Sequence, residues 1–337
     1  MVTIAQIGIG YWGPNLLRNL VANRHCRVKT VVDVAPGRRE FVEALYPGIA
    51  TTPDSDAVLS DPEIDAIIIA TPVATHFDLA LKVLQQGKHA LVEKPMARTA
   101  QEVEQIQSLA TDNQLVAMAG HTFIYNAAVR YLKKLVEEET LGHIRYISSQ
   151  RLNLGRIRTD VDALWNFAPH DVSIIQYLLG DPQPLQVSSQ GMDFVQEGIA
   201  DVVFLHISYP NKIMAHVHVS WLDPHKVRRM TIVGSKKMAV YDDMAENKIA
   251  IYDKGIEPRA ILGENMDFDH PDFTKFHQRS GDVLLPKIDF VEPLQTEVEH
   301  FLECIRNRTP CLTGPAHALQ VVRILSDADG CEVGETR

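Results

Sequence analysis

The sequence predicts an α/β protein of two domains: an open parallel sheet covered by helices, followed by an α/β domain with a large, mostly antiparallel open sheet. Three observations predict this class. A glycine-rich turn joins the first strand to the first helix, strands and helices alternate through the first third, and long strands with alternating apolar residues dominate the second half. We place the boundary after residue 121, which gives domains 1–121 and 122–337.

Composition restricts the class of partner. The 337 residues are 45% hydrophobic and carry a formal net charge of −10, with a pI near 5.8. Such a chain can bury two cores, and its acidity argues against nucleic acid or a membrane surface as a partner. The four cysteines form no CxxC pair and no metal-ligand spacing, so we interpret them as free thiols in a reducing compartment. The longest apolar run, Ala66 to Ala70, is too short to cross a bilayer, and we expect a cytoplasmic protein.

The first strand and helix flank a glycine motif. Val2 to Ile7 is a β-branched run, and Gly8-Ile-Gly-Tyr-Trp-Gly13 follows before a helix expected over Asn15 to Asn23. Pro14 suits a helix start, because its missing N–H would be unpaired there. In this context the motif G-x-G-x-x-G predicts a Rossmann domain. Its glycines allow a tight turn, close approach to a pyrophosphate and close packing of helix on strand.

Asp33 bears on the choice of cofactor. It ends the second strand, Val28 to Val32, and lies 20 residues past Gly13. A carboxylate there can accept both ribose hydroxyls of NAD and would repel a 2′-phosphate, so we predict NAD rather than NADP. Arg38 and Arg39 could instead hold a 2′-phosphate, although we expect them on the solvated face of the next helix.

The alternation continues to residue 121. Ile64 to Ala70 is a buried strand ending at Thr71-Pro72, and His76 opens a helix over Phe77 to Gln86 that Gly87 terminates. The remaining elements are a strand at His89–Glu93, a helix at Ala100–Thr111 capped by Thr99, and a strand at Leu115–Ala119. For His76, a cofactor contact and a helix-start role both remain open.

The tripeptide Glu93-Lys94-Pro95 follows a strand end directly. Ligands of open parallel sheets bind outside the carboxyl ends of the strands, and Pro95 restricts the backbone that presents the Lys94 ammonium. We therefore expect Lys94 to take part in catalysis. The residues expected to contact the cofactor are Gly8, Gly10, Tyr11, Trp12, Gly13, Asp33, Thr71, His76, Glu93 and Lys94.

The second half changes pattern. After a helix over Ala127 to Glu138, two more helices are expected, at Pro169–Leu179 and about Leu294–Arg306, with an irregular segment at Gly255–Lys287. The expected strands are Ile144–Leu152, Gln186–Met192, Asp201–Ser208, Ile213–Trp221, Val227–Val233 and Met238–Tyr241.

A three-residue loop at Pro210-Asn-Lys212 keeps the apolar residues of its two strands on one face and sets His206 opposite His216. Phe204, His206, His216 and His218 then share the other face. Zinc binding there is conceivable, but no carboxylate or thiol completes a ligand set. We interpret the face as a subunit interface, predict no metal, and expect a homodimer or homotetramer.

Three stretches carry a resemblance to a known family: Gly8–Gly13, Ala70-Thr-Pro-Val-Ala-Thr-His76 and Gly87-Lys-His-Ala-Leu-Val-Glu-Lys-Pro95. The chain resembles the Gfo/Idh/MocA oxidoreductases over nearly its whole length. The resemblance implies a Rossmann domain followed by an α/β domain whose open sheet often forms oligomers. Gly120-His121, Leu141-Gly142, Gly281–Pro286 and Glu292-Pro-Leu294 are similar to members that act on UDP-linked aminosugars, which makes His121 a candidate substrate residue.

The resemblance also implies an acid/base residue. The stretch Trp165-Asn-Phe-Ala-Pro-His-Asp171 matches the family segment whose histidine faces the nicotinamide, so His170 takes that role. If His170 does not act as the base, Lys94 or a tyrosine such as Tyr125 is the alternative. Many members carry Asp where this chain has Asn166, which supplies no charge and is expected to position substrate. Arg156 and Arg158 are candidates for a substrate phosphate or carboxylate.

The expected function is hydride transfer between NAD and a secondary alcohol or ketone of a sugar, and we expect that sugar to be linked to a nucleotide. Two alternatives remain. One is a redox-neutral enzyme of the same family that uses NAD to eliminate a glycosidic bond, and the other is a non-catalytic nucleotide-sensing regulator. Retention of Lys94 and His170 argues against the regulator.

Overall fold

The computed structural model describes residues 1–155, 157–260 and 274–329. The chain forms two compact units that interleave along the sequence instead of dividing at one point. The first contains residues 1–127, 164–181 and the chain from Phe290 through the last helix, and the second contains 128–163 and 182–289. No helix in the described part of the chain is long and apolar enough to span a membrane.

The first unit is built on a six-stranded parallel sheet with the order β3-β2-β1-β4-β5-β6. The order reverses between β1 and β4, which is the topological switch point where such sheets bind dinucleotides. Its strands are β1 (Val2–Ile7), β2 (Cys26–Val32), β3 (Ala50–Thr52), β4 (Ala66–Ile69), β5 (His89–Glu93) and β6 (Ala117–Gly120). The helices between them are α1 (Gly13–Ala22), α2 (Pro36–Leu45), α3 (Asp56–Leu59), α4 (His76–Gln85) and α5 (Ala100–Asp112).

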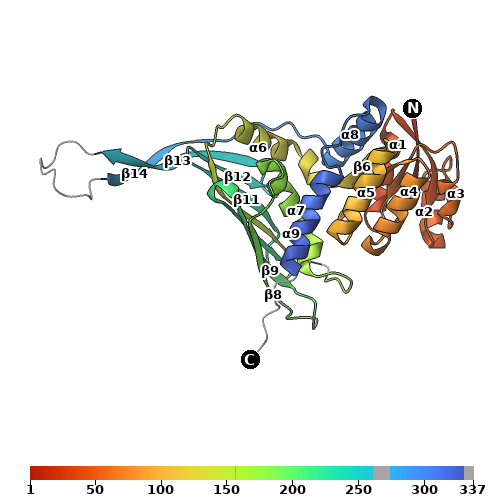
Figure 1. Ribbon diagram of the computed structural model, residues 1–337, viewed down its shortest axis with the longest axis horizontal. Helices are drawn as coiled ribbons and strands as arrows, with labels where there is room; N and C mark the ends of the chain where they lie inside the picture. Colours follow the sequence, from red (N-terminus) through yellow and green to blue (C-terminus); the bar gives the residue numbers. More distant parts are fainter. Residues whose placement is uncertain (156, 261–273, 330–337) are drawn as a thin grey trace, which may run out of the picture. The chain divides into compact units, whose positions relative to one another are not determined.

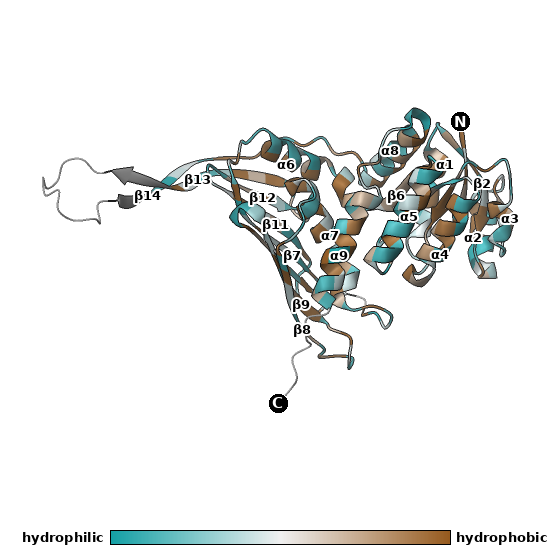
Figure 2. Ribbon diagram, viewed as in Figure 1, coloured by the Kyte–Doolittle hydropathy of each residue, from teal (hydrophilic) through white to brown (hydrophobic). Residues whose placement is uncertain are grey.

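Both faces of this sheet are buried. Along β4, Ile67 and Ile69 join one hydrophobic cluster while Ala66 and Ile68 join the other, as the two-residue period of a strand requires. The covering helices are amphipathic, and Figure 2 shows hydrophobic and hydrophilic residues mixed along α4 and α8.

Three helices from later in the chain complete the first unit. They are α7 (Ala163–Leu179), α8 (Pro293–Asn307) and α9 (Pro315–Asp329), and Figure 1 shows α8 and α9 in blue among the red and orange elements. Phe301 of α8 enters one cluster, and Val322 of α9 enters the other. We did not predict α9 from the sequence.

The predicted start of α7 is wrong. We expected the helix to begin at Pro169, but it begins at Ala163 and Pro169 lies inside it. Proline normally marks a helix start because it lacks an N–H and its ring clashes with the preceding turn. Here the first turn is held by packing, since Ala163 and Leu164 are buried and Trp165 packs against the hydrophobic cluster around Ile67.

The second unit contains α6 and an eight-stranded, mostly antiparallel sheet with the order β14-β13-β12-β11-β7-β10-β9-β8, in which only β7 and β10 pair in parallel among the described strands. The bounds are α6 (Ala127–Glu137), β7 (Ile144–Leu152), β8 (Gln186–Met192), β9 (Val202–Tyr209), β10 (Ile213–Ser220), β11 (Val227–Gly234), β12 (Met238–Asp242), β13 (Ile249–Ala260) and β14 (Thr274–Leu284). The predicted fold class is therefore confirmed.

Two predictions about this sheet have clear outcomes. The loop Pro210–Lys212 joins β9 to β10, and His206 pairs with His216, as the apolar register predicted. Part of the segment Gly255–Lys287, which we expected to be irregular, forms the ends of β13 and β14, in which Gly255 lies opposite Arg279. Residues 261–273 of that segment lie outside the described residues. Glycine and proline within these strands obscured their period in the sequence.

Candidate active site

The glycine turn after β1 has the geometry that its motif predicts. Gly8 has φ +99°, and a Cβ there would lie 2.5 Å from the Ala70 carbonyl oxygen. A Cβ on Gly13 would lie 2.5 Å from the Gly8 carbonyl oxygen, so α1 and the turn pack closely only with glycine. A Cβ on Gly10 would meet nothing within 4 Å. The turn therefore leaves open space beside Gly10 next to the N-terminus of α1, where a pyrophosphate fits.

Gln6 is a residue of this site that sequence reasoning missed. It is buried in β1, and its Nε2 donates hydrogen bonds to the carbonyl oxygens of Gly8 and Gly13, each at 2.9 Å. These bonds hold the two ends of the glycine turn together. A glutamine among apolar residues, two positions before the motif, was the available signal.

Asp33 lies at the end of β2 beside the glycine turn. Its carboxylate accepts hydrogen bonds from the Ile9 N–H at 2.8 Å and the Ala35 N–H at 2.9 Å. Arg39 of α2 is partly exposed, and its Nη1 donates to the carbonyl oxygens of Asp33 and Val34 at 2.7 and 3.1 Å. Arg38 is exposed, as expected. The Arg39 guanidinium is thus held by backbone carbonyls at the end of β2, which include that of Asp33.

His76 joins two loops of the candidate site. Its ring is buried, with Nε2 2.8 Å from the Thr71 carbonyl oxygen and Nδ1 2.8 Å from the Pro95 carbonyl oxygen. Burial lowers the pKa of His76 despite the two carbonyl partners. Both ring nitrogens face backbone carbonyls, so the imidazole acts as a clamp between the loops after β4 and β5.

Glu93 carries an enclosed carboxyl group at the end of β5. A Cβ on Gly120 would lie 3.1 Å from its carboxyl carbon, and its Oε1 is buried without a hydrogen-bond partner. Burial raises the pKa of Glu93 to about 7, although the Lys94 ammonium and a hydrogen bond from Trp12 act in the opposite direction. Trp12 is 38% exposed and Tyr11 is 87% exposed, so both residues of the turn reach solvent.

Lys94 connects β5 to α7. Its Nζ donates a hydrogen bond to the Asn166 backbone carbonyl oxygen at 3.0 Å, and the Lys94-Pro95 peptide bond is cis. His170 follows Asn166 by one helical turn, about 6 Å along the axis. The His170 ring packs edge-on against Phe123, with ring centroids 5.0 Å apart. The structure therefore brings Lys94, Asn166 and His170 together within the first unit.

Buried polar residues lie around His121, the first residue after β6. His121 is 1% exposed and its ring lies edge-on to His317, with centroids 5.4 Å apart. Burial, with His317 and Lys94 nearby, holds the pKa of His121 well below its usual value. His317 Nδ1 lies 2.7 Å from Asp181 Oδ1. Sequence reasoning missed His317 and Asp181, because they come from distant segments.

Glu297 of α8 is a second enclosed carboxyl group that we did not anticipate. It is fully buried and accepts a hydrogen bond from the Thr122 hydroxyl at 2.7 Å. Burial raises the pKa of Glu297 well above its usual value, and the Glu93 carboxyl adds to that rise. The negative charge of an ionised Glu93 thus disfavours ionisation of Glu297.

Three other predicted residues lie elsewhere. Arg156 falls outside the described residues. Arg158 belongs to the second unit and forms an ion pair with Asp160 at 2.5 Å. Tyr125 is 1% exposed and its hydroxyl lies 3.0 Å from Thr313 Oγ1, while burial raises its pKa well above the usual value. The Tyr125 hydroxyl is therefore poorly suited to exchange a proton with a substrate.

The parallel sheet, the glycine turn at its switch point and the lysine at the end of β5 define a dinucleotide-binding oxidoreductase. Residues 2–121 match the oxidoreductase family with an NAD-binding Rossmann fold, and residues 129–240 match the Gfo/Idh/MocA C-terminal domain. The chain belongs to the Gfo/Idh/MocA family of oxidoreductases, as its resemblance implied.

Individual relatives differ in their named reactions. The 2,7-anhydro-N-acetylneuraminate hydratase of Mediterraneibacter gnavus is 23% identical over 95% of this chain and 87% of its own length. The NAD⁺-dependent scyllo-inositol 2-dehydrogenase of Bacillus subtilis is 26% identical over 93% of this chain and 89% of its own. The UDP-N-acetylglucosamine 3-dehydrogenase of Acidithiobacillus ferrooxidans is 30% identical over 60% of this chain and 62% of its own. A crystal structure of that dehydrogenase has a TM-score of 0.78, with 25% identity, 97% of this chain covered and 96% of that one.

Proposed function

We propose that this protein is an NAD-dependent dehydrogenase that acts on a secondary alcohol of a nucleotide-linked sugar, with Lys94 and His170 as the catalytic residues. The observation that carries the proposal is the hydrogen bond from Lys94 Nζ to the Asn166 carbonyl at 3.0 Å. The bond fixes the ammonium at the carbonyl of the residue one helical turn before His170. This supports a substrate site that the Lys94 ammonium and the His170 imidazole share.

Each side chain has a role that its chemistry supports. His170 accepts the proton of the substrate hydroxyl, because a neutral imidazole is a base near physiological pH. Lys94 donates a hydrogen bond to the same oxygen and stabilises its developing negative charge. NAD, when bound, supplies the acceptor for the hydride that leaves the substrate carbon.

The residues around the glycine turn fit NAD. Gly8, Gly10 and Gly13 leave room for the pyrophosphate, and Asp33 offers its carboxylate to the adenosine ribose. The Asp33 carboxylate disfavours a 2′-phosphate, while Arg39 is bonded to backbone carbonyls. Tyr11, Trp12, Thr71, Glu93 and Lys94 line the same strand ends, and His76 acts through the loops that it clamps.

The sugar class follows from the relatives named for UDP-N-acetylglucosamine and scyllo-inositol. In this proposal Asn166 and His121 orient the sugar, and Arg156 is a candidate for the nucleotide phosphates. The experiment is to screen UDP-sugars with NAD by thermal shift and then to follow formation of reduced cofactor. A nucleotide sugar that raises the melting temperature and yields stoichiometric NADH supports the proposal. No NADH with any bound sugar contradicts it.

A redox-neutral reaction is the second candidate function. The observation that favours it is the relative named as a hydratase, which matches 95% of this chain. A redox-neutral enzyme would convert its substrate with no net NADH, and its cofactor would be reduced only transiently. Product analysis alongside the cofactor measurement separates the two reactions, since only the dehydrogenase consumes NAD in proportion to product.

A further inference from the structure

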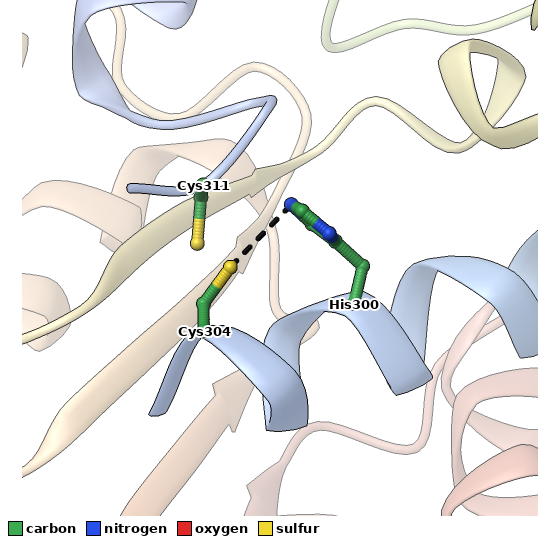
Figure 3. A group of neighbouring side chains, drawn as sticks. All are labelled: His300, Cys304 and Cys311. Atoms are coloured by element: carbon green, nitrogen blue, oxygen red, sulfur yellow. Dashed lines mark hydrogen bonds between the residues drawn. The ribbon is translucent and has the colours of Figure 1, made fainter. Parts of the chain in front are cut away.

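Two cysteines and a histidine converge in the first unit, and none of them has a role in the proposed reaction. His300 and Cys304 lie one turn apart on α8, and Cys311 lies in the loop that follows (Figure 3). One ligand atom from each side chain lies within 4.8 Å of the other two. In the part of the chain that the structure describes, this is the only group of three such side chains at that spacing.

The spacing fits a tetrahedral metal ion. Bond lengths of about 2.3 Å for Zn–S and 2.0–2.1 Å for Zn–N place sulfur and nitrogen ligands roughly 3.5 Å apart. Cys304 Sγ lies 3.5 Å from His300 Nε2. Figure 3 shows the sulfur atoms of Cys304 and Cys311 pointing toward each other from opposite elements. An ion between the three atoms could therefore bind without a large movement of the backbone.

The tautomer of His300 also suits a metal. The Leu312 N–H donates to His300 Nε2 at 2.9 Å, which leaves the proton on Nδ1 and a lone pair on Nε2. Two thiolates would balance the charge of a divalent ion. The ion must compete with the Leu312 amide for Nε2, which weakens binding relative to an unoccupied lone pair.

The cluster adjoins the edge strand of the parallel sheet. Two residues after Cys311, Thr313 bonds to Ala119 of β6, accepting from its N–H and donating from its own hydroxyl, each at 2.8 Å. An ion held by the three residues would fix this loop between α8 and β6. The strand β6 leads directly into His121, so the ion would stabilise the backbone that carries a residue of the candidate site.

We propose that His300, Cys304 and Cys311 form a binding site for a thiophilic d¹⁰ cation, Zn²⁺ in the first instance. Three protein ligands leave a fourth position for water or another small donor. Soft thiolate ligands select such cations over Mg²⁺ or Ca²⁺. Because the thiols must lose their protons, binding should release protons and weaken as the pH falls.

The test uses the full chain carrying Cys331→Ser, which removes a cysteine outside the described residues. Zn²⁺ affinity is measured by competition with a chromogenic chelator, and Co²⁺ is used as a spectroscopic probe. We expect one ion per chain, intense thiolate-to-cobalt charge-transfer absorption, and a higher melting temperature with Zn²⁺. Cys304→Ser, Cys311→Ser or His300→Asn should each weaken Zn²⁺ binding by more than about 10²-fold. Even the loss of a residue that only hydrogen-bonds to a metal ligand lowers metal affinity by about 10–100-fold.

Cys26→Ser is the matched control. Cys26 is a buried free cysteine of the same unit and lies outside the cluster, so its loss should leave Zn²⁺ affinity unchanged. NAD binding and circular dichroism verify that each variant is folded. A wild-type Co²⁺ spectrum without thiolate charge transfer, or equal Zn²⁺ affinity in the cluster variants and wild type, would overturn the proposal. The proposal would also be overturned if the reduced protein does not bind Zn²⁺ but forms a Cys304–Cys311 disulfide when treated with peroxide.

Discussion

The Lys94 ammonium donates a hydrogen bond to the Asn166 backbone carbonyl at 3.0 Å, and this bond joins the end of β5 to α7. The partner is a main-chain atom, so the contact does not depend on whether residue 166 is Asn or Asp. It also gives Lys94 a fixed position before a substrate binds. A pre-positioned donor loses little by reorganisation when charge develops on a substrate oxygen.

Replacing Lys94 by methionine tests this role. Lys94→Met keeps most of the apolar stem but removes the donor, so it should lower kcat by about 10²–10³-fold, the usual loss for one oxyanion donor. NAD affinity should change much less, because the interaction is made mainly in the transition state. Steady-state kinetics and NAD titration measure both quantities. Lys82→Met, at an exposed position of α4, should leave both unchanged.

Asp33 should set the cofactor preference. Asp33→Asn keeps an acceptor for one of the Ile9 and Ala35 amides but removes the negative charge, so the preference for NAD over NADP should narrow by about 1–3 kcal/mol. Titration of both cofactors into wild type and variant gives the difference. If wild type binds NADP more tightly, Arg39 or Arg38 contacts the 2′-phosphate and our assignment of Asp33 is wrong.

Glu93 should make stability depend on pH. Its pKa is raised from 4.5 to about 7 in the folded protein, so the folded state holds a proton that the unfolded state has lost. The contribution of Glu93 to the free energy of unfolding should therefore be highest below about pH 4.5. It should fall as the pH rises toward 7, by at most about 3 kcal/mol. Glu93→Gln should flatten that fall.

Melting temperatures of wild type and Glu93→Gln between about pH 4 and 8, a range that spans the pKa of the unfolded and of the folded state, measure this effect. Glu40→Gln is the control, because Glu40 is exposed on α2. An unchanged pH dependence in Glu93→Gln would mean that the Glu93 carboxyl is ionised in the folded state throughout this range.

The histidine-bearing face of the second sheet should be an interface between subunits. Phe204 stacks on His218 with ring centroids 4.2 Å apart, and Phe204 and Met214 are 39% and 53% exposed in the single chain. Exposed apolar groups clustered on a broad sheet are typical of association surfaces. Light scattering should give a mass at least twice 37.7 kDa, and Phe204→Glu with Met214→Glu should reduce it. A wild-type monomer at micromolar concentration would exclude this interface.

Local patterns in the sequence predicted those parts of the fold and site that depend on neighbouring residues. The glycine turn, Asp33 and the pairing of His206 with His216 follow from spacing and strand period. The helix α9, the clamp role of His76 and the enclosed pair Glu93 and Glu297 depend on contacts between distant segments, which no local pattern encodes. Pro169 misled the prediction of α7 because tertiary packing outweighed its usual effect on a helix.

The most direct test of the central claim is the rate at which bound NAD is reduced in a single turnover by wild type and His170→Ala. This rate reports hydride transfer whether or not the complete reaction is redox-neutral. If His170 accepts the substrate proton, the variant should reduce NAD about 10²–10⁴-fold more slowly while binding NAD with similar affinity. Reduction by His170→Ala at a rate near that of wild type would contradict the assignment and transfer the role of the base to Lys94.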